Sequence, residues 1–232
     1  MNVVVFDTET TGLEWKVNSI VSLGAVDLTS GDEFYKECKI IPGSETNLDA
    51  LKVNGFSKEQ VLDENKCSPK ELLIEFSNWL DRHKCDVLCG FNVLFDLKFI
   101  LGIVKKYNLD WNLPVDYIDL EAEFVNKIVN VDHFKNLRAQ TDALYPSKNG
   151  YSSDIKINYI SMNRALKFFS IADEPNPHNA LGGAKYACEL YALMYDKSHF
   201  LRDFDKYVIP LEFRNYKIDK TINKFDYRKL LD

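Results

Sequence analysis

Apolar runs separated by short polar turns fill the first 45 residues of the chain. Val3 to Phe6 form a continuous apolar run, which is typical of a buried strand. Residues 20–28 and 33–41 have the same character, and the turn Thr29-Ser-Gly-Asp32 separates them. Because the connections are short, the pattern predicts three successive antiparallel strands.

The next part of the chain changes to helical periodicity. Asn54-Gly55 predicts a turn before a short helix that starts at Ser57. At Ser68-Pro-Lys-Glu71 the signals for a helix start coincide, with serine as the N-cap, proline at the first position and glutamate at the third. An apolar stripe follows that predicts packing on a sheet, formed by Leu72, Leu73, Phe76, Trp79 and Leu80.

Strands and helices alternate in the rest of the chain. Residues 86–91 and 115–120 predict two further strands, and a helix follows the first of them. Weaker patterns predict more helices, over 122–129 and 133–144, from Ser161 onward, and around Leu190 to Met194. These elements predict an α/β fold with a mixed five-stranded sheet and helices on both faces. We expect residues 1–196 to form one domain and residues 197–232 an ordered C-terminal extension packed on it.

Composition limits the classes of protein to consider. The chain has 232 residues, of which 46% are apolar and 28% charged, as in ordinary soluble globular proteins. No stretch approaches the ~20 apolar residues of a membrane span, so we expect no membrane partner. Five scattered cysteines complete no zinc site, which favours reduced thiols in an intracellular, cytoplasmic protein. The net charge of −6 argues against a general binder of duplex phosphate but not against a nuclease, because bound cations supply positive charge locally.

Two acids follow the first apolar run. Side chains alternate along a strand, so Asp7 and Glu9 are expected on one face, about 7 Å apart. Neighbouring carboxylates repel each other, and a divalent cation with hard oxygen ligands, such as Mg²⁺ or Mn²⁺, removes that penalty. Most isolated Asp-x-Glu pairs are solvated acids, so the surrounding sequence has to decide.

Three separated segments carry a resemblance to one family. Val5-Phe-Asp-Thr-Glu-Thr-Thr-Gly-Leu13 resembles the first motif of the DnaQ-like DEDD 3′–5′ exonucleases, a superfamily that includes proofreading subunits of bacterial replicative polymerases such as the epsilon subunit of DNA polymerase III. Gly90-Phe-Asn-Val-Leu-Phe-Asp96 is similar to the second motif. His178-Asn-Ala-Leu181, followed by a helix, resembles the His-x-Ala-x-x-Asp motif of the DEDDh branch. The resemblance covers roughly residues 1–195 and implies a ribonuclease H-like fold.

One position departs from the family pattern. Counting from His178, the fourth acid of the family falls at Gly183, whose side chain cannot hold a metal. Asp173 and Glu174, in the loop before His178, are alternative acids, whereas Glu189 faces elsewhere on the helix. We therefore expect a weakened metal site with slow or conditional activity.

The resemblance implies hydrolysis of the 3′-terminal phosphodiester with two divalent ions, Mg²⁺ or Mn²⁺, and release of a 5′-mononucleotide. It implies that Asp7 bridges both ions, that Glu9 holds the water-activating ion and that Asp96 holds the second ion. His178 is the implied acceptor of the proton from the attacking water, a role that suits histidine at neutral pH. Together the resemblance places Asp7, Glu9 and Asp96 close to one another, near His178.

The resemblance also implies residues that contact the substrate. Thr8, Thr10, Thr11 and Leu13 lie in the turn that grips the terminal nucleotide in the family, with the apolar residue against its base. Phe95 either stacks on a base in the same way or packs in the core. Asn92 either positions the substrate or ties the backbone of its loop.

Two functions from different classes remain at this stage. The first is a metal-dependent exonuclease acting on the 3′ end of single-stranded DNA or RNA. The alternative is a catalytically silent domain that uses the same cleft to bind nucleic acid or a protein partner in replication, repair or RNA processing. The aromatic-rich C-terminal extension is also a candidate for homodimer contacts.

Overall fold

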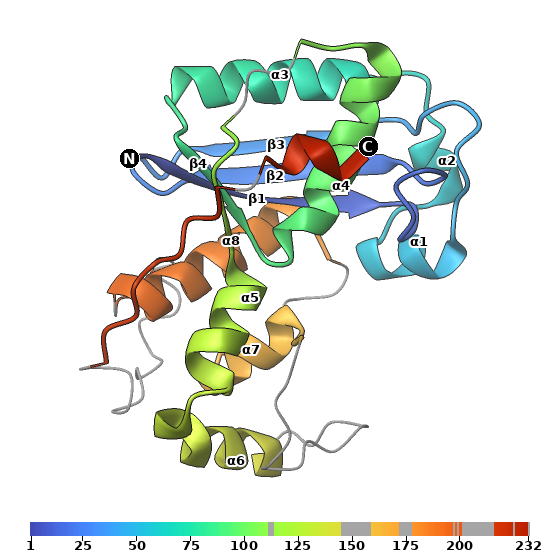
Figure 1. Ribbon diagram of the computed structural model, residues 1–232. Helices are drawn as coiled ribbons and strands as arrows, with labels where there is room; N and C mark the ends of the chain where they lie inside the picture. The colour runs from blue at the N-terminus through green and yellow to red at the C-terminus, as the bar shows by residue number, and fades with distance from the viewer. Residues whose placement is uncertain are drawn as a thin grey trace.

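A five-stranded sheet with the strand order β3-β2-β1-β4-β5 forms the centre of the computed structural model (Figure 1). β1 pairs antiparallel with β2, and β2 pairs antiparallel with β3. β4 runs parallel to β1, and β5 runs parallel to β4, so the predicted mixed sheet is confirmed. The strands are β1 (Val3–Thr10), β2 (Ile20–Asp27), β3 (Glu33–Glu37), β4 (Val87–Gly90) and β5 (Tyr117–Asp119). The structure describes residues 1–110, 114–144, 159–171, 178–196, 198, 200, 216–224 and 226–231.

The two faces of the sheet are covered by different helices. On one face lie α3 (Pro69–Arg82) and α4 (Val93–Tyr107), which pack on alternate residues of β1, Val4 and Phe6 (Figure 1). α3 begins as its sequence predicts, because Ser68 and Glu71 form a capping box and its buried residues include the predicted stripe.

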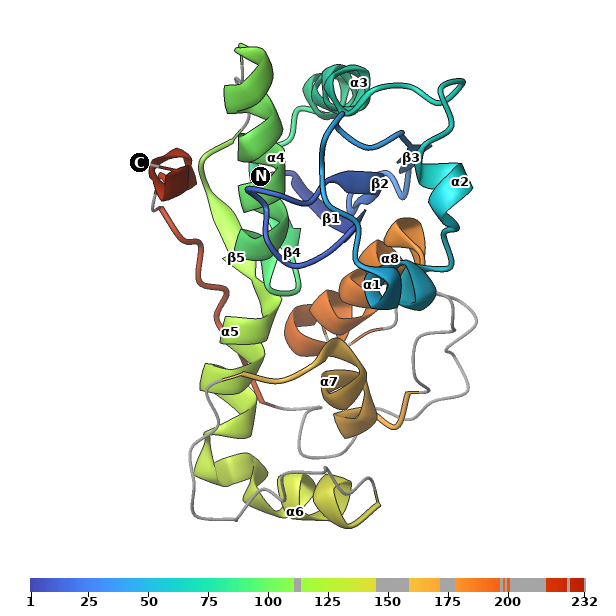
Figure 2. The same ribbon diagram turned by 90° about the vertical axis from the view of Figure 1, so that its right-hand side faces the viewer.

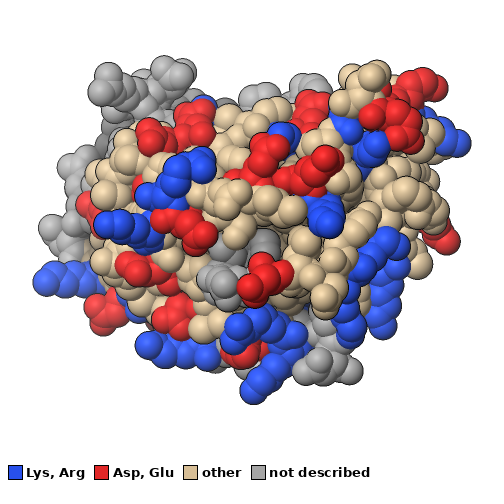
Figure 3. Space-filling view, turned by 90° about the horizontal axis from the view of Figure 1, so that it is seen from above, with Lys and Arg blue, Asp and Glu red and all other residues tan. Residues whose placement is uncertain are grey.

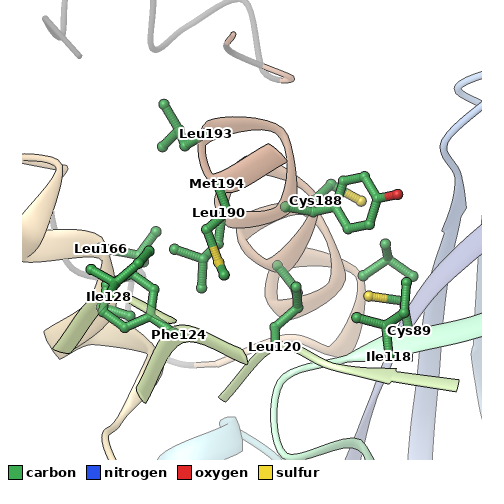
Figure 4. Close-up of a cluster of buried hydrophobic side chains, with 14 of the residues drawn as sticks. Cys89, Ile118, Leu120, Phe124, Ile128, Leu166, Cys188, Leu190, Leu193 and Met194 are labelled. Atoms are coloured by element: carbon green, nitrogen blue, oxygen red, sulfur yellow. The ribbon is translucent and has the colours of Figure 1, made fainter. Parts of the chain in front are cut away.

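The other face carries α5 (Leu120–Phe124), α7 (Met162–Phe168) and α8 (Ala180–Tyr191) (Figure 2). Val3 and Val5 of β1 contribute to the core beneath them, and side chains such as Phe124, Leu166 and Leu190 fill it (Figure 4). β1 is therefore buried on both faces up to the point where its acids begin.

Shorter elements surround this framework. Near the end of β1 are α1 (Leu48–Asn54) and α2 (Lys58–Val61) (Figure 1). The segment after α5 continues as a π-helical turn (Val125–Val129), a 3₁₀ turn (Asp132–Phe134) and α6 (Lys135–Leu144), while a second π-helical turn (Ala192–Asp196) follows α8.

Two local predictions were wrong. The sequence predicted only a turn before Ser57, whereas the structure has α1 there, capped by the side chain of Asn47. The third strand was predicted to reach residue 41 but ends at Glu37. The chain leaves the sheet because its backbone finds other partners: Lys39 donates to the carbonyl of Cys67, and Ile40 donates to that of Val61.

The described part of the C-terminal extension packs on the domain. Tyr117 of β5 and Asn223 exchange two backbone hydrogen bonds of 3.1 and 2.8 Å. A 3₁₀ turn (Tyr227–Leu231) follows, in which Tyr227 is fully buried and donates a 2.7 Å hydrogen bond to the carbonyl of Pro114. The division into two parts at residue 197 stays a prediction.

Within the described ranges no helix combines the length and the apolar character that crossing a membrane requires. All five cysteines are free thiols.

The burial of Tyr227 predicts how strongly the extension stabilises the domain. Tyr227→Phe removes one hydrogen bond and should lower the free energy of unfolding by roughly 0.5–1.5 kcal/mol. Tyr227→Ala also removes the ring and should cost about 3–5 kcal/mol. Urea denaturation measures both values, and equal, small losses for the two variants would show that the ring is not buried in solution.

Candidate active site

Asp7 and Glu9 lie on the face of β1 that α8 covers. They continue the row of Val3 and Val5, which pack in the α8 core, and both acids are half-buried. Across the sheet, Asp7 is paired with Gly24 and Glu9 with Ser22 of β2. The expected placement of the two carboxylates on one face of the strand is therefore confirmed.

The first turn of α8 lies directly on this part of the sheet. A Cβ atom at Gly24 would stand 2.2 Å from the backbone nitrogen of Leu181, so only glycine allows this approach. Further along the same turn, a Cβ atom at Gly183 would stand 2.4 Å from Asp7 Oδ2. Position 183, where the family motif would place its fourth acid, thus lies against the Asp7 carboxylate.

The segment that leads into α8 is anchored at two points. The backbone nitrogen of His178 donates to the carbonyl of Val53, at the end of α1, over 2.9 Å. Asn179 caps α8 by accepting from Leu181 and Gly182, and its side-chain nitrogen donates to the Tyr35 hydroxyl. The half-buried His178 is therefore held at the end of α8 that faces β1. Asp173 and Glu174, the alternative acids, lie outside the described residues.

Asp96 is held on the opposite face of β1. It lies in the first turn of α4, and its Oδ1 accepts hydrogen bonds from the backbone nitrogen of Thr8 (3.0 Å) and from the Thr8 hydroxyl (2.5 Å). Thr8 alternates with Asp7 and Glu9, so its side chain points to the other side of the strand. Burial raises the pKa of Asp96 to about 7, although the hydrogen bonds from Thr8 lower it.

The threonines of the predicted nucleotide-binding turn are used within the protein. Besides Thr8, Thr10 donates its hydroxyl to the carbonyl of Gly12, and Thr11 donates to the carbonyl of Glu45. Leu13 differs from them, because 79% of its surface is exposed. Substrate contacts by these residues stay a prediction. Because the threonine hydroxyls are bonded within the protein, such contacts would come from backbone groups and from the exposed Leu13 side chain.

Asn92 and Phe95 sit at the start of α4. Asn92 adopts a left-handed conformation (φ 58°), and its backbone nitrogen donates to the Asp119 carboxylate, which favours the structural alternative for this residue. Phe95 is half-buried, and its ring packs against Phe99 with centroids 5.1 Å apart.

Sequence reasoning assigned no role to Asp119, which the structure places beside this turn. Its carboxylate also accepts hydrogen bonds from the backbone nitrogens of Glu121 and Ala122. One side chain therefore caps α5 and also holds the turn between β4 and α4. The signal was present, because an acid directly before a helical segment is an N-cap pattern.

The carboxylate oxygens of the site are suitable ligands for a divalent cation, but few of them lie close together. The carboxylate oxygens of Asp7 and Glu9 are hard ligands of the type that Mg²⁺ and Mn²⁺ prefer. Among the described residues, however, no three His, Cys, Asp or Glu side chains form a group that could hold a metal ion. Gly183 contributes no ligand, and Asp96 Oδ1 is bonded to Thr8. The residues therefore fit an ion that keeps several of its waters, as Mg²⁺ readily does.

One face of the molecule carries charges of both signs. Figure 3 shows acidic and basic side chains interspersed over one face of the molecule, in keeping with the net charge of −6.

Comparison with known proteins places this geometry in a family. A model described as "Exonuclease" (RNase_T) matches residues 4–191. PolC-type DNA polymerase III of Thermotoga petrophila is 37% identical over 123 residues, and that of Listeria innocua is 31% identical over 140 residues. These matches cover 51% and 59% of the chain but only 8% and 9% of the polymerases, so the chain spans a small part of the length of these relatives.

Solved structures of low sequence identity share the fold. The nuclease domain of 3′hExo, a DEDDh family member bound to rAMP, has a TM-score of 0.59 at 15% identity, with 87% of this chain and 94% of that chain covered. E. coli Exonuclease I in complex with a dT13 oligonucleotide has a TM-score of 0.60 at 15% identity, with 88% and 43% covered. The expected ribonuclease H-like exonuclease fold is thereby confirmed.

The raised pKa of Asp96 predicts a pH dependence of stability. An unfolded aspartate ionises near pH 3.9, so between about pH 4 and 7 the folded chain keeps a proton that the unfolded chain has lost. The contribution of this group to the free energy of unfolding should therefore fall as pH rises through that interval. Asp96→Asn, which retains an acceptor for Thr8, should remove this part of the pH dependence.

Urea denaturation of both proteins at pH 5 and pH 7.5, without divalent cations, measures the difference. The wild type should lose more stability than Asp96→Asn over this range. The same loss in both proteins would show that Asp96 is ionised throughout.

Proposed function

From the premise that this chain belongs to the exonuclease family whose model it matches, we propose that it is a metal-dependent 3′–5′ exonuclease whose hydrolysis is slowed by the glycine at position 183. Its substrate is the 3′ end of single-stranded DNA or RNA, and its product is a 5′-mononucleotide. The observation that carries the proposal is the contact between Gly183 and Asp7, because the residue expected to complete the metal site lies beside it and has no side chain.

The residues proposed to hold divalent ions are Asp7 and Glu9, with Asp96 as the third acid. When bound, such ions supply the positive charge that activates a water molecule and stabilises the leaving 3′ oxygen. Asp7 contributes most directly, since its carboxylate lies between the strand and the first turn of α8. Loss of one acid ligand removes negative charge and one fixed oxygen from the site, so cation affinity should be low and the activity conditional on cation concentration.

His178 is the proposed acceptor of the proton from water. Its backbone hydrogen bond to Val53 and the capping role of Asn179 hold this segment at the start of α8. A base held in this way loses little conformational freedom when substrate binds. Leu13, exposed beside the same strand end, is the proposed contact for the terminal base.

A second candidate function has specific support. Asp96 is bonded to Thr8 on the far face of β1, and the described residues bring no three candidate ligands together. Those two features favour a silent domain that binds a nucleic-acid 3′ end or a protein partner without cleaving. The homologous PolC-type polymerases make a replication context the leading proposal for such a partner.

A nuclease assay separates the two candidates. A single-stranded oligonucleotide labelled at its 5′ end, as DNA and as RNA, is incubated with Mg²⁺ or Mn²⁺, and the products are resolved by length. Stepwise shortening from the 3′ end with release of 5′-mononucleotides is the expected outcome, and it should disappear in Glu9→Ala. An oligonucleotide that is bound but stays intact with both cations would overturn the exonuclease proposal in favour of the silent domain.

Restoring the missing acid provides a sharper prediction. Gly183→Asp should raise the rate by at least about tenfold, since the loss of even an outer partner of a metal site typically costs ~10–100-fold. Gly182→Asp is the matched control, because the neighbouring residue is turned about 100° round the helix and should give no gain.

Stability gives the same test an independent readout. The new side chain would place a second carboxylate against Asp7, so Gly183→Asp should be less stable than the wild type without divalent cations and should recover on addition of Mn²⁺. The absence of both the rate gain and the Mn²⁺-dependent recovery would show that position 183 does not adjoin the metal site.

A further inference from the structure

A cavity of about 270 Å³ lies between the β1–β2 loop and the C-terminal half of α4. Its apolar wall includes Trp15 from the loop and Phe99 and Ile103 from the helix. Trp15 is half-buried and is one of the residues that line the cavity. The volume lies just below the ~300–1,000 Å³ of sites for drug-sized ligands, which suits a smaller group such as one nucleobase.

The charge of this cavity is opposite to that of the chain. Lys16, Lys105 and Lys106 line it, and the described lining residues include no acid. The whole chain has 35 acidic against 29 basic residues. Lys105 and Lys106 lie in the last turn of α4, where the helix dipole favours cations. Lys16 comes from a different segment, so two parts of the chain bring positive charge to one place.

A glycine of α4 allows Trp15 to lie close to the helix. A Cβ atom at Gly102 would stand 3.0 Å from Trp15 Cε3, so a glycine at this point lets the indole ring lie against the helix. Lys16 Nζ lies 5.5 Å from the centroid of the same ring. An aromatic surface and a cation are therefore adjacent, and this is the combination that binds a base and its phosphate.

Helix α4 carries both Asp96 and part of the cavity lining. Phe99 lines the cavity and packs on Phe95, which is the neighbour of Asp96. Lys105 is nine residues beyond Asp96, about 14 Å along the helix axis at 1.5 Å per residue. A single strand whose end lies at the end of β1 would follow α4 to reach the lysines.

We propose that this cavity binds one nucleotide of the same strand whose 3′ end occupies the active site, with the base on Trp15 and phosphate groups beside Lys16, Lys105 and Lys106. The proposal rests on the proposed function, because the strand is positioned by its end. Stacking on an aromatic ring tolerates any base, and lysines contact phosphates without regard to sequence. The subsite would hold the strand in place without selecting its sequence.

Binding of a fluorescent single-stranded 12-mer, measured by anisotropy in EDTA so that no hydrolysis occurs, tests the subsite. Trp15→Ala should weaken binding about 5- to 150-fold, the effect expected for losing one stacked base, and Trp15→Phe should recover most of it. Lys105→Gln with Lys106→Gln should make the plot of log affinity against log salt shallower by about 1.4, since each phosphate contact on a single strand contributes about 0.7. Lys58→Gln with Lys70→Gln, at exposed positions outside the cavity, should leave that slope unchanged.

The outcomes distinguish the subsite from the function itself. A nucleoside monophosphate, titrated in parallel, should bind the wild type and Trp15→Ala equally; loss of mononucleotide binding in Trp15→Ala would overturn the proposal in favour of a site for free nucleotides. Equal binding of the 12-mer by wild type and all cavity variants, with exonuclease activity intact, would overturn the subsite alone. A wild type that does not bind the 12-mer in EDTA would overturn the subsite, whereas only the absence of shortening from the 3′ end with both Mg²⁺ and Mn²⁺ in the nuclease assay would overturn the proposed function.

Discussion

Backbone-to-backbone contact between α8 and β2 at Gly24 is the constraint on which the candidate site depends. Because no side chain separates them there, the first turn of the helix lies lower on the sheet than ordinary helix packing allows. The same approach brings Gly183 against Asp7 and holds His178 and Asn179 beside the end of the strand. Any residue larger than glycine at position 24 would lift the helix and separate these groups from the carboxylates of β1.

β1 divides the acids of the site between its two faces. Asp7 and Glu9 face α8, while Thr8 faces α4 and holds Asp96 through two hydrogen bonds. Burial raises the pKa of Asp96, and the two hydrogen bonds from Thr8 oppose that rise. The chain matches the exonuclease family over residues 4–191, and a glycine stands at position 183, against the Asp7 carboxylate.

Much of the framework could be predicted because local signals and burial agree. The continuous apolar run of β1 is buried on both faces, and the capping box at Ser68 begins α3 as its sequence indicates. α1 was missed because a seven-residue helix has little periodicity to read, and its cap, Asn47, resembles an ordinary turn residue. The bond of the Thr11 hydroxyl could not be predicted, since it depends on the carbonyl of Glu45, which tertiary folding brings within reach, whereas Thr10 bonds locally to the carbonyl of Gly12. The resemblance placed the fourth acid of the family at position 183, and the structure puts this position against the Asp7 carboxylate.

The pairing of Asn223 with Tyr117 has a consequence for the molecule in solution. β5 is the last strand of the sheet, and an uncovered outer strand presents backbone groups on which another chain can add a strand of its own. Asn223 satisfies the backbone nitrogen and oxygen of Tyr117, and the buried ring of Tyr227 fastens the segment that follows. The segment around Asn223 thus occupies the backbone groups of Tyr117 at this edge, so a version shortened before Asn223 would retain the acids of β1 and expose those groups to pairing with another chain.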